Sequence, residues 1–135
     1  MLLVLDATEL FAAMIKEGKA AEILVSDKVD LITPEFIISE FKSHKDELLS
    51  KTHRSAEDFD KFLAIAEDKI EVILGSELKH SLKEAESLSP DPDDVQYFAA
   101  ALKYSCAIWS EERLLKKQGK VKVLSTSELA KELGI

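Results

Sequence analysis

The sequence is poor in cysteine and glycine, and it has no long apolar run. Its 135 residues include one cysteine, Cys106, so no intramolecular disulfide can form. We expect Cys106 to be a buried, reduced thiol, because it lies in an apolar run typical of a strand. The four glycines include no G-x-G-x-x-G pattern, so a dinucleotide-binding fold is poorly supported.

Signals for a membrane or for export are also missing. The longest uninterrupted apolar runs are only a few residues, which is far too short for a transmembrane helix. The apolar start, Met1 to Leu5, stops at Asp6 without a basic flank or a site that resembles a cleavage site. We therefore expect a cytoplasmic protein that makes no contact with a membrane.

Positive charge is in short supply. The chain has 18 Lys and Arg against 26 Asp and Glu, which gives a net charge of -8. This balance disfavours a protein that covers nucleic acid, because non-specific affinity comes from basic side chains on phosphates. Basic residues nevertheless recur at 42–54 and 113–122. These two stretches could flank an acidic cleft, although solvated helix faces are the simpler interpretation for most of their members.

Strand and helix signals alternate along the whole chain, which predicts one α/β domain over residues 1–135. We expect strands at residues 2–5, 29–33, 70–74, 106–109 and 121–124. We expect helices at residues 6–16, 20–26, 34–49, from 55, 77–88, from 92, 111–118 and 125–133. The helices from 34 and from 55 should form an antiparallel hairpin. Because every crossover contains helix, parallel pairing of the strands is favoured.

Several helix starts are marked by capping patterns. Asp6-Ala7-Thr8-Glu9 and Ser125-Thr126-Ser127-Glu128 have the form of a capping box. Thr33-Pro34 and Asp91-Pro92 combine a cap with proline at the first helical position. Pro34 is thus expected to open its helix, with Phe36, Ile37, Phe41 and Leu48 facing the core.

Acidic residues are placed where strands end and helices begin. Asp6 closes the first strand, and ligands of an open parallel sheet sit at the carboxyl ends of its strands. Asp93, Asp94, Glu111 and Glu112 fall in first helical turns, where the helix dipole alone would favour them. Glu40 lies nearly two turns into its helix and stacks on the inward stripe. It is therefore either solvated at the rim or aimed at a cleft.

Carboxylates that converge raise one another's pKa unless a positive charge compensates. A divalent cation would supply that charge. Oxygen ligands without nearby histidine or cysteine suit Mg²⁺ or Mn²⁺. Zinc is disfavoured, because the three histidines are scattered and Cys106 has no partner at ligand spacing.

At this point the chain resembles the PIN-domain ribonucleases, which include toxins of prokaryotic toxin–antitoxin modules and RNA-processing nucleases. The resemblance covers essentially the whole length. Its most specific part runs from Asp94, with Tyr97, Ala99 and Ala101, to Ile108-Trp109-Ser110-x-Glu112. Further carriers are the first strand with Asp6 and Thr8, and Thr33-Pro34 followed by Glu40.

The resemblance implies a three-layer fold with a five-stranded parallel sheet in the order 3-2-1-4-5. It implies that Asp6, Glu40, Asp94 and Glu112 are the catalytic, metal-binding carboxylates for Mg²⁺ or Mn²⁺. Thr8 and Ser110 would line the site, and Glu111 could take over the role of Glu112. The family usually has aspartate at the fourth position, whereas this chain has glutamate there. Asp91 and Asp93 are secondary candidates, interpreted as a cap and a dipole partner.

The implied activity is metal-dependent endonucleolytic hydrolysis of single-stranded RNA, with an antitoxin protein as a partner and a homodimer as the assembly. The alternative is a PIN fold without catalysis that acts as an interaction or RNA-binding module. Phosphotransfer domains fit worse. A haloacid-dehalogenase-like phosphatase needs a second aspartate where Thr8 stands, and a receiver needs an acidic acceptor where Ile73-Leu74-Gly75-Ser76 offers none.

Overall fold

A parallel sheet forms the centre of the molecule. The computed structural model describes residues 1–15 and 18–135. Among these residues, five strands pair in the order β3-β2-β1-β4-β5, and every pairing is parallel. The strands are β1 (Leu2–Leu5), β2 (Asp30–Pro34), β3 (Ile70–Ile73), β4 (Ala107–Trp109) and β5 (Val123–Leu124). The expected fold class and strand order are confirmed.

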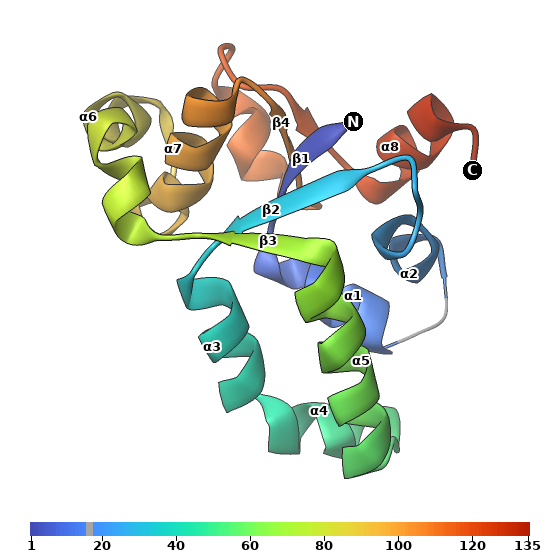
Figure 1. Ribbon diagram of the computed structural model, residues 1–135. Helices are drawn as coiled ribbons and strands as arrows, with labels where there is room; N and C mark the ends of the chain where they lie inside the picture. The colour runs from blue at the N-terminus through green and yellow to red at the C-terminus, as the bar shows by residue number, and fades with distance from the viewer. Residues whose placement is uncertain (16–17) are drawn as a thin grey trace.

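Helices cover the sheet on both sides and extend beyond it (Figure 1). They are α1 (Ala7–Ile15), α2 (Lys19–Leu24), α3 (Phe36–Ser43), α4 (Lys45–Thr52), α5 (Ala56–Lys69), α6 (Lys79–Leu88), α7 (Val95–Tyr104) and α8 (Thr126–Leu133). In Figure 1, α6 packs beside α7 on the left, and α2 beside α8 on the right. The expected end of the first helix, Lys16, lies outside the described residues. No helix among the described residues has the length and apolar character needed to cross a bilayer.

The register of the sheet brings the ends of β1 and β4 together. Leu5 stands opposite Trp109, and the Asp6 amide continues the ladder by donating to the Trp109 carbonyl at 3.1 Å. On the other side of β1, the buried Thr33 hydroxyl donates to the Leu5 carbonyl at 2.9 Å. Whatever follows β1 and β4 in the sequence therefore meets at one edge of the sheet.

The helix expected at 34–49 differs from the structure in two ways. Pro34 is still the last residue of β2, because the pairing with β3 continues past Thr33: Pro34 stands opposite Ile73, and the Glu35 amide donates to the Ile73 carbonyl at 3.0 Å. The helix also breaks at His44, which ends α3 and precedes α4 with a backbone φ of -96° and ψ of 13°. The turn brings Leu48 into the core and the His44 ring edge-on against Phe11.

The expected helical hairpin is present. Phe41 of α3 stacks on Phe59 of α5 with ring centroids 5.2 Å apart. Lys42 pairs with Glu67 and Lys45 pairs with Asp60, so chain numbers rise along one partner as they fall along the other. The two segments are antiparallel, and they extend downward together in Figure 1.

Short 3₁₀ helices replace parts of the expected α-helices. They are η1 (Gly75–Leu78), η2 (Pro92–Asp94) and η3 (Arg113–Lys117). The expected strand at 121–124 shortens to β5, because the Gln118 side chain bonds to the backbone of Val121. Its side-chain amide donates to the Val121 carbonyl at 2.7 Å and accepts from the Val121 amide at 2.8 Å.

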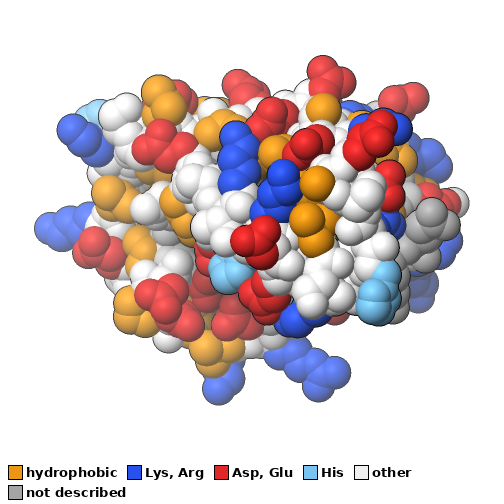
Figure 2. All heavy atoms as spheres, turned by 90° about the horizontal axis from the view of Figure 1, so that it is seen from below, with side chains coloured by type: hydrophobic (Ala, Val, Ile, Leu, Met, Phe, Trp, Pro, Cys, Tyr) orange, Lys and Arg blue, Asp and Glu red, His pale blue; other side chains and the backbone are white. Residues whose placement is uncertain are grey.

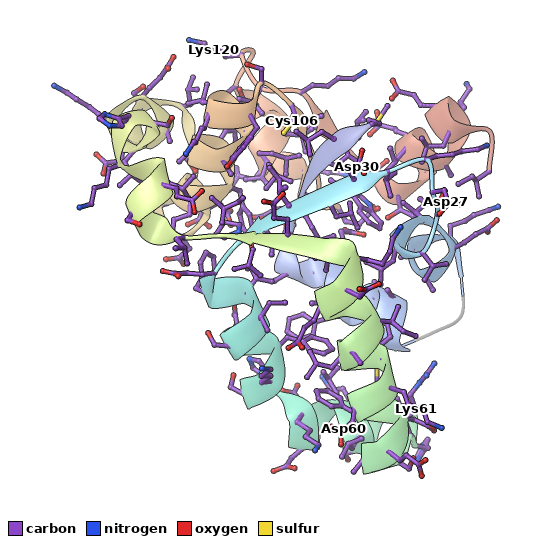
Figure 3. All side chains as sticks on the ribbon, in the orientation of Figure 1. Asp27, Asp30, Asp60, Lys61, Cys106 and Lys120 are labelled. Carbon is purple, nitrogen blue, oxygen red and sulfur yellow. The ribbon has the colours of Figure 1, made fainter. Side chains whose placement is uncertain are left out.

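Cys106 immediately precedes β4. We expected a buried thiol, but the residue is only half-buried. Burial raises the pKa of its thiol to about 11, so the thiol stays protonated at neutral pH. Figure 3 places Cys106 and Lys120 in the upper part of the molecule, at the amino end of β4. The thiol therefore lies at the opposite end of the strand from Ser110.

Candidate metal centre

The candidate site begins where β1 and β4 end. Asp6 follows β1 directly and its side chain is buried, with 4% of the residue exposed. Ser110 follows β4 and is equally buried. Its hydroxyl donates to Asp6 Oδ2 at 2.5 Å and accepts from the Glu112 amide at 3.0 Å. Ser110 thus connects the end of one strand to the backbone that carries Glu112.

Asp94 comes from the opposite side, at the junction of η2 and α7. Asp91 caps η2 as expected, accepting from the Asp93 amide at 2.9 Å. The Asp94 amide in turn donates to the Asp91 carbonyl at 3.1 Å. This tight turn directs Asp94 into the molecule, where it is 8% exposed, while Asp93 stays exposed.

Three carboxylates converge at this point. One oxygen from each of Asp91, Asp94 and Glu112 lies within 4.8 Å of the other two. Asp91, interpreted from sequence as a cap, therefore serves both as a cap and as a member of the cluster. Glu112 is half-buried, and its extra methylene relative to aspartate does not keep it out of the group.

The negative charges of the cluster make it harder for Asp94 to ionise. Burial raises the pKa of Asp94 to about 7, and the charges of Glu112, Asp6 and Asp91 add to the effect. Asp94 Oδ2 is buried, and no protein atom among the described residues offers it a hydrogen bond. A buried polar atom without a partner is unfavourable, so this oxygen is available to a ligand from outside the chain.

Tyr97 lies beneath the acidic groups on α7. Its hydroxyl accepts a hydrogen bond from the Ala7 amide at 3.2 Å and so satisfies a free N–H at the start of α1. Burial raises the pKa of Tyr97, and the negative charges of Asp6, Asp94 and Glu40 raise it further. Tyr97 therefore stays neutral and is buried close enough to the acidic residues to feel their charges.

The other expected site residues are placed less centrally. Glu40 is exposed on α3 and is not part of the three-carboxylate group, although its charge still acts on Tyr97. The Thr8 side chain is exposed, and its backbone amide donates to Asp6 Oδ1 at 3.3 Å. Glu111 turns away, because its carboxylate accepts from the Thr126 amide at 2.5 Å. The metal-binding roles assigned to Asp6, Glu40, Asp94 and Glu112 stay predictions.

Sequence reasoning missed Glu9. Instead of reaching back to close a capping box, its side chain is buried with 1% exposed. It accepts from the Glu111 amide at 2.9 Å and from the Thr126 hydroxyl at 2.8 Å. Burial raises its pKa to about 7. No local pattern in the sequence distinguishes this arrangement from an ordinary helix start.

The donor set fits a hard divalent cation. All the converging atoms are carboxylate oxygens, which Mg²⁺ and Mn²⁺ prefer. The partnerless Asp94 oxygen and its raised pKa are both relieved by a cation. Asp91, Asp94 and Glu112 are the residues positioned to hold such an ion, with Asp6 beside them.

Most lysines of the two basic stretches are paired with acidic residues. Figure 2 shows the face seen from below, where Asp and Glu side chains gather in the lower left part. Lysines of both basic stretches are engaged in ion pairs with nearby acids: Lys42 with Glu67, Lys45 with Asp60, Lys51 with Glu47, Lys116 with Glu128, Lys120 with Glu84 and Lys122 with Glu132. Asp60, the partner of Lys45, is labelled at the lower end of α5 in Figure 3. The basic stretches are thus largely neutralised locally.

Comparison with known proteins supports the fold and the family. No curated protein matches the chain significantly. Among solved structures, the chain is similar to the crystal structure of VapBC2 from Rickettsia felis bound to a DNA fragment from their promoter. The TM-score is 0.67 at 12% sequence identity, and the match covers 93% of this chain and 98% of that chain. The family model for the PIN domain matches residues 4–134. The chain therefore belongs to the PIN-domain family.

Proposed function

We propose that this protein is a divalent-metal-dependent endoribonuclease that hydrolyses single-stranded RNA. The observation that carries the proposal is the Asp94 carboxylate. It is buried, one of its oxygens has no partner among the described residues, and two further carboxylates stand within 4.8 Å. If the cluster bound no cation, replacing one of these carboxylates by a neutral side chain would make the protein more stable. The presence of all of them in one place therefore favours a cation-dependent activity.

The residues of the chain have separate roles in this proposal. Asp94, Glu112 and Asp91 hold the cation, and Asp6 completes the negative environment beside them. When bound, the cation orients and activates water and stabilises the charge that develops on the phosphate oxygens. Ser110 keeps Asp6 oriented through its 2.5 Å hydrogen bond. Glu40, exposed on α3 and outside the three-carboxylate group, would add negative charge to the site.

Family membership supports the nuclease class, because PIN domains are generally nucleases. The fold similarity to a VapBC2 structure supports a place in a toxin–antitoxin module. In that setting the protein is a cytoplasmic toxin whose partner is an antitoxin protein. A homodimer would extend the surface that RNA can contact.

The test is cleavage of unstructured single-stranded RNA in the presence of Mn²⁺. We compare the wild type with Asp6→Asn, Asp94→Asn and the matched control Asp93→Asn. Asp93 is exposed and lies next to Asp94, so its substitution makes the same change of charge outside the cluster. Loss of cleavage in the first two variants with retention in the control supports the proposal. Equal activity in all four proteins rejects it.

A second candidate is a PIN fold that binds partners or RNA without catalysis. It is favoured by the net charge of -8 and by glutamate, rather than the usual aspartate, at position 112. Calorimetric titration with Mn²⁺ separates the candidates. Binding by the wild type that Asp94→Asn abolishes supports the nuclease. A wild type that binds no Mn²⁺ supports the non-catalytic module.

A further inference from the structure

Glu9 is the most completely buried acidic side chain among the described residues, with 1% exposed. Both of its oxygens are used. One accepts from the Glu111 amide at 2.9 Å, and the other accepts from the Thr126 hydroxyl at 2.8 Å. These partners lie 102 and 117 positions away in the sequence. A carboxylate with such distant partners fixes tertiary structure rather than the start of its own helix.

The contacts continue beyond Glu9 into the start of α8. The indole N–H of Trp109, the last residue of β4, donates to the Thr126 hydroxyl oxygen at 3.0 Å. The Thr126 amide donates back to the Glu111 carboxylate at 2.5 Å. Helix α1, the segment after β4 and the start of α8 are thus joined in one network, in which Glu9 supplies the link from α1.

The segment Ser110–Glu112 depends on these contacts. β4 ends at Trp109 and η3 begins at Arg113, so residues 110–112 have no regular secondary structure of their own. Ser110 is held by Asp6 on one side. Glu111 is held by Glu9 on the other. The next residue is Glu112, whose carboxylate belongs to the acidic cluster.

We propose that Glu9 is a positioning residue that holds the Ser110–Glu112 segment so that the Glu112 carboxylate faces Asp94. Glu9 acts through the Glu111 backbone and does not itself contact the cation. The part of this inference that concerns the cation rests on the proposed function. Substitution of a residue that orients a metal ligand without binding the metal itself typically lowers metal affinity by about 10- to 100-fold.

Two variants separate positioning from charge. Glu9→Ala removes both acceptors, so the Glu111 amide loses its partner and the Thr126 O–H loses its acceptor, while the Thr126 oxygen still accepts from Trp109. Glu9→Gln keeps an acceptor for the Glu111 amide but presents an amide donor to the Thr126 oxygen, so it should hold the Glu111 backbone without the charge while the Thr126 O–H loses its acceptor. Leu129→Ala is the control for a general loss of folding stability. Leu129 is fully buried in α8 and takes no part in this hydrogen-bond network.

The first measurement needs no metal. Trp109 is the sole tryptophan of the chain, so its indole resonance in a ¹H–¹⁵N spectrum reports the network without overlap. We expect Glu9→Ala to move the indole and Glu111 amide resonances and to speed hydrogen exchange at the Glu111 and Glu112 amides. Glu9→Gln and Leu129→Ala should leave the exchange at these two amides close to that of the wild type.

The second measurement is Mn²⁺ affinity by calorimetry or electron paramagnetic resonance. We expect Glu9→Ala to bind about tenfold more weakly, with Glu9→Gln and Leu129→Ala close to the wild type. Unchanged exchange at Glu111 and Glu112 in Glu9→Ala overturns the inference. Equal weakening of Mn²⁺ binding by Leu129→Ala also overturns it, because stability alone would then explain the loss. A wild type that binds no Mn²⁺ overturns the proposed function instead, while the exchange data still decide whether Glu9 positions the segment.

Discussion

The Ser110 hydroxyl donates to Asp6 Oδ2 at 2.5 Å, although the two residues are 104 positions apart in the sequence. Both side chains are buried where adjacent parallel strands end. The same hydroxyl oxygen accepts from the Glu112 amide at 3.0 Å. One small side chain therefore fixes the orientation of one acidic residue and the backbone of another.

Ser110→Ala should therefore disturb the acidic site more than its size suggests. The variant leaves Asp6 Oδ2 and the Glu112 amide each short of a partner, which costs about 1 to 3 kcal/mol of unfolding free energy. Mn²⁺ affinity should fall by about tenfold. Chemical denaturation and Mn²⁺ titration provide the two measurements. Ser87→Ala is the control, because the exposed Ser87 hydroxyl bonds only within its own helix. Equal effects of both substitutions would contradict the role given to Ser110.

Glu112→Gln should lower the pKa of Asp94. The Glu112 charge is the largest cause of that raised pKa after burial, and the substitution removes the charge at nearly constant volume. Carboxyl carbon shifts followed by NMR across pH 4 to 9 would give the Asp94 titration directly. Glu111→Gln is the matched control, because the Glu111 carboxylate bonds to Thr126 instead. An unchanged midpoint in Glu112→Gln would show that the two carboxylates do not interact.

Asp94→Asn should stabilise the protein at pH 8. The folded-state pKa of Asp94 is about 7, against an ordinary value of 3.8, so the folded protein binds the extra proton between these values. Stability therefore falls as pH rises through this window, and the cost is fully present above pH 7. We expect a gain of about 1 to 3 kcal/mol at pH 8 that vanishes near pH 4. Thermal unfolding at both pH values, with Asp93→Asn as the control, tests this. A loss of stability at pH 8 would count against it.

The framework of the site was predictable from sequence for a simple physical reason. Parallel strands end at a common edge, so the residues that follow them were expected at that edge, while the adjacency of the strands that end at Leu5 and Trp109 was implied by the resemblance to PIN domains. Asp94 followed from the cap and proline pattern that begins its helix. Strand ends and helix starts of this kind can be recognised from short stretches of sequence.

The Glu9 network was not predictable, because its partners are non-local. The sequence suggests a capping box at the starts of α1 and α8, and the box forms only at α8. At α8, Ser125 accepts from the Glu128 amide at 3.2 Å and Glu128 accepts from the Ser125 amide at 3.0 Å. At α1, Glu9 finds Glu111 and Thr126 instead. The helix break at His44 was also not predictable, because no proline or glycine near that position marks the end of a helix.

The aromatic cluster of the helical hairpin should carry much of its stability. Phe41 is 1% exposed and stacks on Phe59 at 5.2 Å and on Phe11 at 5.5 Å. Phe41→Ala should cost about 3 to 5 kcal/mol in urea unfolding. Val72→Ala is the control, because Val72 is 39% exposed and its truncation should change stability by about 0.5 kcal/mol or less. A cost for Phe41→Ala no larger than that of the control would show that the hairpin is loosely packed.

Mn²⁺ binding should depend on pH, because a proton and the cation compete for Asp94. With a pKa of about 7, half of the Asp94 carboxyls are protonated at pH 7, and metal binding must displace those protons. Affinity should therefore fall by about tenfold from pH 8 to pH 6. Calorimetry at pH 7 in buffers of different ionisation enthalpy should detect release of about half a proton per ion. In Glu112→Gln the lower pKa of Asp94 should move the whole dependence to lower pH. An affinity that stays constant from pH 6 to pH 8 would place the bound ion away from Asp94.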